Sequence, residues 1–275
     1  MRVIVMKRHA GLSLLELLVA MIVGLFITVG ISSIYVGNKR SSLTTNELSQ
    51  LQDNGRSVLQ LLSDVIQHTA YTSTSIAPVE DMFIRGAVST SVCSDGSDSV
   101  VNPSLFTALK NNSGVFGDTI GVIYMGDGTL NTDCAASVLP VPCRVGGGSA
   151  ATTASRIYNY FSVKNNADGV PVLMCAGSRT NTAQEVAEGV ENIQFTYGED
   201  MNSDGTADRY VNADTVSNWS AVVSVNIAVL VRSLKPVATT KVSRSYKLSE
   251  DTTVTRNDKY LRAVFTSTVL LRNVL

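Results

Sequence analysis

The first forty residues hold the feature that most restricts how this chain can fold, a long apolar run with a single charge. The run begins at Leu12, continues to about Val36, and is interrupted only by Glu16. At helical rise, about 25 residues exceed the roughly 20 that a helix needs to cross the hydrocarbon core of a bilayer. Basic residues precede the run, among them Lys7 and Arg8. Positive charge on that side keeps the N-terminus in the cytoplasm. The sequence therefore predicts one membrane span with the rest of the chain beyond it.

The residues before the run differ from an ordinary secretory signal. Such a signal has a shorter apolar core followed by a small-residue cleavage site. Here the small residue, Gly11, comes before the apolar run, and Glu16 follows inside it. This order resembles the type IV prepilin signal. The resemblance implies that a prepilin peptidase cuts after Gly11 and that Leu12 becomes the methylated N-terminus. Leu12 stands where that family usually has Phe.

The acid inside the apolar run needs a partner. A carboxylate within a membrane span costs about 2.5–3.5 kcal/mol on insertion scales, so it is usually paired. The resemblance implies that Glu16 is an assembly residue and that it pairs with the N-terminal amine of a neighbouring subunit. The alternative is a plain membrane anchor that tolerates one acid near its cytoplasmic end.

The helical pattern continues after the apolar run ends. Apolar residues recur at steps of three, four and seven, which predicts an amphipathic helix to about Thr69. These residues are Leu43, Leu48, Leu51, Val58, Leu59, Leu62, Val65 and Ile66. Glycines such as Gly24 and Gly55 are positions where a helix is weaker and where we expect bending.

The remaining residues, 70–275, predict a β-rich head. Several runs alternate apolar and polar residues with period two, as half-buried strands do. They are residues 119–125, 156–164, 170–175, 190–197, 219–234 and 260–271. A short helix is expected at 103–109. Alternation with one polar face suits an antiparallel sheet packed on a helix. The predicted fold class is α+β.

Two stretches extend the resemblance into the head. Val190–Asp208 (VENIQFTYGEDMNSDGTAD), followed by a Trp-led strand, and Leu261–Asn273 (LRAVFTSTVLLRN) resemble the minor pilin family PilW. The J-type pseudopilin of type II secretion is a close relative. The resemblance implies the type IV pilin fold, a long N-terminal helix packed on an antiparallel sheet. Its expected parts are a leader (1–11), a transmembrane half-helix (12–36), an amphipathic half-helix (37–69) and a head (70–275).

The resemblance also implies a function, partners and a location. The chain is expected to be a non-enzymatic minor pilin of a priming or tip complex, required for pilus assembly and so for twitching, adhesion or DNA uptake. Expected partners are other minor pilins, the major pilin, the prepilin peptidase, the inner-membrane assembly machinery and a tip adhesin. The head would be periplasmic before assembly, with one span in the inner membrane, and part of the surface pilus afterwards. Two alternatives stay open: a type II secretion minor pseudopilin, and a membrane-anchored adhesin without an assembly role.

Composition and motifs argue against other classes of protein. A net charge of -1 gives no bulk affinity for nucleic acid. No Gly-x-Ser-x-Gly elbow is present, and no triad can be assembled around the two histidines, so no enzymatic activity is expected.

The four cysteines all follow the predicted span, in an oxidising compartment where two disulfides are expected. Zinc is disfavoured because no CxxC spacing is present. Four cysteines allow three pairings, and spacing does not choose among them. The resemblance to PilW-like sequences implies Cys134–Cys175, which leaves Cys93–Cys143.

A loop in the head has the spacing of a calcium site. Oxygen-bearing side chains occur at loop positions 1, 3, 5 and 9, a glycine at position 6, and a carbonyl at position 7, as in an EF-hand loop. The candidate ligands are Asp200, Asn202, Asp204, Thr206 and Asp208. Val211 replaces the bidentate glutamate at position 12, so a ligand from elsewhere, Glu199 or Asp214, would be needed. The alternative is a metal-free hairpin loop, because turns use the same residues. Calcium is the one cofactor that the sequence suggests.

The leader hypothesis makes a direct prediction. Replacing Gly11 with a bulky residue (Gly11→Leu) should block cleavage, because the cut follows a small residue. Mass spectrometry of the membrane-inserted protein should then show the leader still attached, whereas the unaltered chain starts at Leu12. A variant chain that still starts at Leu12 would disprove the processing site.

Overall fold

The computed structural model describes residues 13–71, 82–86, 88, 100–111, 114–126, 130, 132–137 and 155–273. The predicted leader (1–11), Leu12, Cys93 and Cys143 lie outside the described residues. The chain divides into two compact units, residues 1–46 and residues 47–275, and each is described by itself below.

Helix α1 (Leu14–Gln67) is a single α-helix of 54 residues that contributes to both units. The predicted helix, 12–69, is confirmed over this range. It continues through Gly24 and Gly55, where bending was expected. Within residues 47–67 its buried residues are Glu47, Leu51, Gly55, Val58, Leu62 and Ile66. These positions recur every three or four residues, which is the spacing of one helix face.

Two four-stranded antiparallel sheets and one hairpin complete the head. The first sheet has the order β1-β2-β3-β4, from β1 (Ile120–Gly126), β2 (Ser155–Asn165), β3 (Pro171–Gly177) and β4 (Gln184–Glu188). The second has the order β10-β7-β5-β6, from β5 (Val190–Glu199), β6 (Arg209–Val211), β7 (Val222–Arg232) and β10 (Arg262–Leu270). β8 (Val242–Lys247) and β9 (Thr253–Asp258) form the hairpin. Short 3₁₀ turns occur at Pro103–Leu105, Gly114–Phe116 and Trp219–Ala221.

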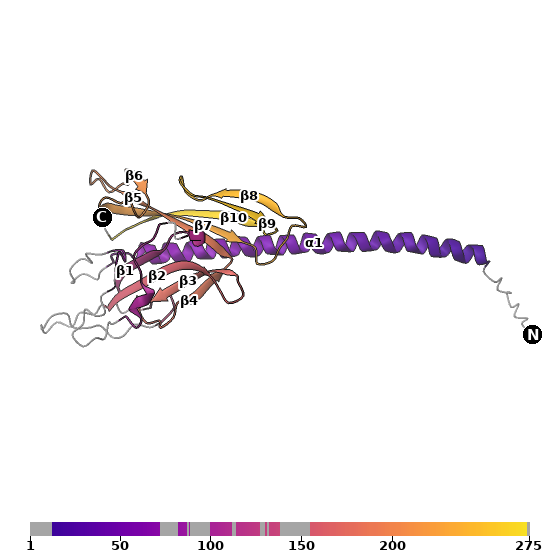
Figure 1. Cartoon of the computed structure of the whole chain (residues 1–275), viewed down its shortest axis with the longest axis horizontal. Coiled ribbons are helices and arrows are strands. Elements are labelled where there is room, and N and C mark those ends of the chain that lie inside the picture. The colour runs from indigo at the N-terminus through magenta and orange to yellow at the C-terminus, as the bar shows by residue number, and fades with distance from the viewer. Residues whose placement is uncertain are drawn as a thin grey trace, which may run out of the picture. The chain divides into compact units, whose positions relative to one another are not determined.

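The two sheets lie on opposite sides of the second half of α1 (Figure 1). Their inner faces and the buried face of α1 form one cluster, and Trp219 packs at its edge against Tyr197, with ring centroids 4.9 Å apart. The α+β class with a long N-terminal helix on antiparallel sheet is therefore confirmed. The structure has two antiparallel sheets rather than one, because β1, β2, β3 and β4 form a sheet of their own. The short helix expected at 103–109 is only a 3₁₀ turn.

Strand β10 runs beside α1 and in the same direction. Near its start, the Glu47 carboxylate accepts the Lys235 N–H at 3.0 Å. Two residues before Lys235, the Ser233 N–H donates to the carbonyl of Leu261, the residue before β10. In its middle, the ring of Phe265 packs on Gly55. Past its end, the Asn273 amide donates to two carbonyls at the C-terminal end of α1 at 3.2 and 3.1 Å. These three contacts fix β10 along the helix.

The β8–β9 hairpin covers part of the outer face of the second sheet. Its apolar side chains Tyr246, Leu248 and Val254 pack on Ala228 and Leu230 of β7. This contact explains why β7 is buried on both faces, although its pattern predicts one polar face.

An ion-pair network fixes the corner between β5, β9 and β10. Arg262, with only 3% of its side chain exposed, binds Glu191 through two N–H···O bonds of 2.6 and 2.9 Å. It also donates to both carboxylate oxygens of Asp258, at 2.7 and 2.6 Å. These hydrogen bonds from Arg262 lower the pKa of Asp258.

Close packing at Gly55 predicts that the helix tolerates no side chain there. A Cβ at this position would overlap the Phe265 ring. Overpacking costs about 1–3 kcal/mol, while alanine in a helix gains about 1 kcal/mol over glycine. We expect Gly55→Ala to lower the midpoint of thermal unfolding of the full chain in detergent, followed by the fluorescence of its single tryptophan.

A double-mutant cycle provides the control for this prediction. In a Phe265→Leu background, the same Gly55→Ala change should be neutral or stabilising, because the smaller side chain can yield. Equal destabilisation in both backgrounds would contradict the packing explanation.

Candidate functional site

Ser13 and Glu16 organise the first turn of α1. The Ser13 hydroxyl oxygen accepts the Glu16 N–H at 3.2 Å, and its carbonyl oxygen accepts the N–H groups of Glu16 and Leu17 at 3.1 and 3.2 Å. The spacing of serine and glutamate is that of a capping box. A carboxylate in the first turn also interacts favourably with the positive end of the helix dipole. The Glu16 side chain is exposed.

The first half of α1 presents apolar side chains in all directions. The most apolar window of the helix has a mean hydropathy of 2.6 and none of it is buried. Leu14 and Phe26, for example, are 79% and 76% exposed. By length and composition this helix is able to cross a membrane. A helix that is apolar all round requires lipid or other helices around it.

The candidate calcium residues share the hairpin loop between β5 and β6. Asp200 accepts four backbone N–H groups, from Asn202 to Gly205, at 2.6–3.3 Å. Asp208 accepts the Met201 N–H at 2.7 Å, and Asp204 accepts the Thr206 N–H at 2.8 Å. The carboxylates therefore hold the loop through its own backbone.

The two additional ligands that the sequence suggested are engaged elsewhere. Asp214 accepts a hydrogen bond from the Asn111 amide at 3.0 Å. Glu199 is buried and accepts the N–H of Ser217 at 2.7 Å and that of Asn218 at 3.0 Å. No group of three or more His, Cys, Asp or Glu side chains is arranged to hold a metal among the described residues. Calcium binding stays a hypothesis, and it requires the carboxylates to give up these bonds.

Glu199 is a buried acid whose pKa lies well below its ordinary value. Burial alone would raise its pKa, but hydrogen bonds from Ser217, Asn218 and Arg209 outweigh burial and lower the pKa to about 2. The Arg209 guanidinium lies 2.7 Å from one carboxylate oxygen. The ionised carboxylate thus joins the end of β5 to β6 and to the segment that precedes β7.

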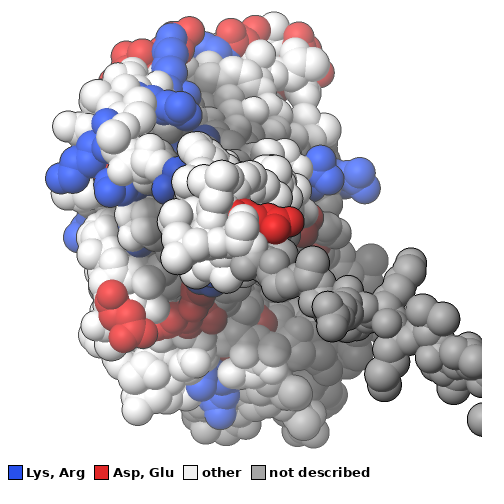
Figure 2. Space-filling view, turned by 90° about the vertical axis from the view of Figure 1, so that its right-hand side faces the viewer, with Lys and Arg blue, Asp and Glu red and all other residues white. Residues whose placement is uncertain are grey.

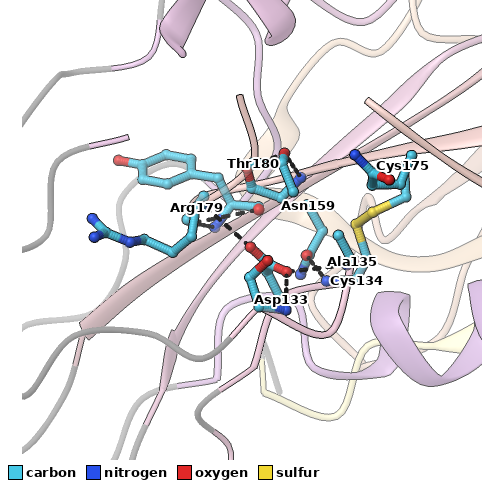
Figure 3. Close-up of a disulfide and its surroundings, with 12 residues drawn as sticks. Asp133, Cys134, Ala135, Asn159, Cys175, Arg179 and Thr180 are labelled. Atoms are coloured by element: carbon cyan, nitrogen blue, oxygen red, sulfur yellow. Dashed lines mark hydrogen bonds between the residues drawn. A yellow bond between two sulfur atoms is a disulfide. The ribbon is translucent and has the colours of Figure 1, made fainter. Parts of the chain in front are cut away.

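A disulfide joins Cys134 to Cys175 of β3, with the two Cα atoms 6.2 Å apart (Figure 3). This is the pairing implied by the PilW resemblance. The adjacent Asp133 is buried and accepts the N–H groups of Ala135, Ser137 and Arg179 at 3.0 Å each. By loop-closure entropy, a crosslink over 41 residues stabilises the fold by about 4 kcal/mol.

Charge on the head is mixed. On the face in Figure 2, Lys and Arg side chains lie beside Asp and Glu side chains at the top of the view, and both kinds are scattered over the rest of the face with much uncharged surface between them. Partners of this face are therefore not selected by one strong field.

The comparisons with known proteins bear on the head. Residues 160–273 match the family model PilW, Type IV Pilus-assembly protein W. The matched range includes both stretches from which the PilW resemblance was predicted, and that prediction is confirmed. The match relates the PilW-like part of the chain, from β2 to β10, to type IV pilus assembly. Helix α1 lies outside the matched range.

A solved structure is also similar. The type IV-like pilin TTHA1219 from Thermus thermophilus aligns with a TM-score of 0.40 and 14% identity, over 82% of this chain and 98% of that chain. No curated protein matches this chain.

Sequence reasoning missed three residues that the structure places in important contacts. The sequence does indicate that Ser13 caps a helix, because a serine three positions before Glu16 is a capping-box signature. The helical spacing also indicates that Glu47 is buried, since it lies four residues before Leu51 on the same face of α1. For Asp133 the sequence could indicate at most the turn contacts with Ala135 and Ser137, because the contact with Arg179 joins residues that are distant in sequence.

The pKa of Glu199 predicts an acid-sensitive head. The ordinary pKa of a glutamate is 4.5. The contribution of Glu199 to the free energy of unfolding is therefore complete above pH 4.5 and is lost as the pH falls toward about 2. Hydrogen bonds to a charged group are worth about 1.5–3 kcal/mol. We expect Glu199→Gln to destabilise the full chain by about this amount at pH 7 and to remove much of the loss of stability between pH 4.5 and pH 2. Glu250→Gln, at an exposed site, is the control and should change neither. An unchanged pH profile in Glu199→Gln would contradict the assignment.

The calcium hypothesis has its own test. If the Asp200–Asp208 loop binds calcium, it should do so weakly, in the range of about 0.1–1 mM typical of extracellular modules. Calorimetry on the full chain should then show saturable heat, and the unfolding midpoint should rise at millimolar calcium. Asp204→Asn should abolish both effects. If the unaltered chain gives no saturable heat and no shift of the unfolding midpoint, the loop is a metal-free turn.

Proposed function

We propose that this chain is a minor type IV pilin, a non-enzymatic structural subunit of a priming or tip complex for pilus assembly. The match of residues 160–273 to a pilus-assembly family carries the proposal. The exposed apolar helix that precedes the head supports it, because a subunit held in a membrane and then in a fibre needs such a surface.

The chemistry of the N-terminus suggests how the subunit is stored and released. Cleavage after Gly11 and methylation of Leu12 would leave a positive amine close to Glu16 of a neighbour. Inside lipid an unpaired carboxylate is unfavourable, so formation of this pair would favour lateral docking. Before docking, the subunit is held by residues 12–36 in the inner membrane, with its head in the periplasm. After docking, it is part of the surface pilus.

The proposed partners are those that the match to a pilus-assembly family implies. Other minor pilins and the major pilin would pack on the apolar half-helix. The prepilin peptidase would act on the leader, the inner-membrane machinery would extract the subunit, and a tip adhesin would bind at the head. The Cys93–Cys143 disulfide belongs to this proposal as well.

Removal of the Glu16 charge tests the role in assembly. In a strain that lacks the native gene, a Glu16→Gln chain should reach the membrane and be processed at Gly11, yet fail to restore surface pili. Glu16→Asp keeps the charge and should restore them at least partly. Sheared pili are quantified by immunoblot of the major pilin, and processing by mass spectrometry.

The deletion strain separates the alternatives. We expect it to lose surface pili. Normal pili together with defective protein secretion would instead indicate a type II pseudopilin. Normal pili with normal secretion would indicate an anchored binding module.

A further inference from the structure

The outer edge of β10 carries backbone groups that have no partner within the described part of the chain. β10 is the last strand of its sheet, and among the described strands only β7 pairs with it. The Leu271 N–H bonds to the Val223 carbonyl, and the Ser233 N–H to the Leu261 carbonyl, both at 2.8 Å. Bonding alternates along an antiparallel ladder. Odd-numbered residues of β10 therefore face β7 with their N–H and C=O groups, and even-numbered residues direct theirs outward.

The accessible part of this edge is short and well defined. Near its start β10 is covered, because Val264 packs in one cluster with Tyr246 of β8. Beyond that point Thr266, Thr268 and Leu270 are exposed, and all three direct their backbone groups outward. The edge from Thr266 to Leu270 extends over about 14 Å at the rise of a strand. An added strand could exchange hydrogen bonds with all three residues.

This edge lacks the features that usually protect a sheet edge. Proteins keep edges from pairing by shortness, charge, bulges or a covering segment. β6 has three residues, β4 has a bulge and carries Glu185 and Glu188, and β1 is bridged by Phe83. β10 has nine residues in unbroken register with β7. It has neither a charge nor a proline from Ala263 to Leu270.

We propose that the Thr266–Leu270 edge of β10 accepts an extended, uncharged segment of a neighbouring pilus subunit, which adds a strand to the sheet. This proposal rests on the function proposed above and names how the head contacts a partner. The segment is uncharged because the edge offers no charge to pair with it. The neighbour is a pilus subunit because the function proposed above places this chain among other pilus subunits, and β10 lies within the range that matches the pilus-assembly family.

Photo-crosslinking of the full chain in cells identifies the occupant. A photoreactive amino acid is placed at Thr268 and, as a matched control, at Ser243. Ser243 also has an outward N–H on an exposed strand, since the Leu248–Thr252 hydrogen bond fixes the alternation in the β8–β9 hairpin. We expect a crosslink to another pilin from position 268 and none from position 243. A crosslink to a second copy, or no crosslink from position 268, would overturn the proposal.

A proline substitution tests the hydrogen bonds themselves. Thr266→Pro removes only an outward N–H, and proline is tolerated on the solvent side of an edge strand. We expect the crosslink from position 268 and the amount of surface pili to fall on the order of tenfold, the effect of about 1.4 kcal/mol. Ser243→Pro should change neither. If Thr266→Pro alters the unfolding followed by Trp219 fluorescence, Thr268→Lys replaces it, because a charge also blocks edge pairing.

The outcomes separate this proposal from the function on which it rests. Normal pili in a deletion strain would overturn the function. Loss of pili on deletion, with normal pili and an unchanged crosslink in Thr266→Pro and Thr268→Lys, would overturn the edge proposal alone.

Discussion

Burial of the apolar face on the second half of α1 is the constraint on which the head depends. Leu51, Val58, Leu62 and Ile66 are at most 1% exposed, and both four-stranded sheets contribute side chains to the cluster around them. Each sheet turns an apolar face to the helix, so neither has a complete core without it. The first half of the same helix has no such cover within the described chain. Its apolar surface is free for lipid or for other subunits, and the chain therefore separates a surface used for folding from a surface available for assembly.

Buried carboxylates hold the connecting segments in place by accepting hydrogen bonds from their backbone. Glu47 binds the backbone of Lys235, Asp133 binds three backbone N–H groups beside the disulfide, and Glu199 binds the segment that precedes β7. Each accepts hydrogen bonds from donors that secondary structure leaves unsatisfied, and such charge-assisted bonds are stronger than neutral ones. Long connections are in this way held to the sheets at single points. Loss of one acid should loosen one connection and leave the central cluster intact.

Sequence patterns predicted the elements whose burial is periodic and missed those whose burial is not. The helix, the β2–β3 hairpin, β5, β7 and β10 all have apolar residues at the spacing of their buried face. β4 (Gln184–Glu188) is mostly polar and at least partly exposed, and β6 has three residues, so neither has a periodic signal. The second sheet was missed for a related reason: local alternation defines a strand but not the sheet to which it belongs. At the candidate loop, spacing placed Asp200 to Asp208 correctly in one turn. It did not show that their oxygens accept backbone N–H groups, because turn residues and calcium ligands share one composition.

The two proposed contact surfaces differ in what they can specify. Packing of apolar helices is weakly directional, and a neighbouring pilin helix of similar composition would fit the first half of α1 about equally well. In the proposed assembly Glu16 would add one charge, which would set the axial position of a neighbour but not its identity. Strand addition is directional, because hydrogen bonds and side-chain alternation fix the register, and a shift by one residue reverses which side chains face inward. An assembly that orders several similar subunits needs a contact of the second kind. The uncharged edge from Thr266 to Leu270 is the surface proposed for such a contact.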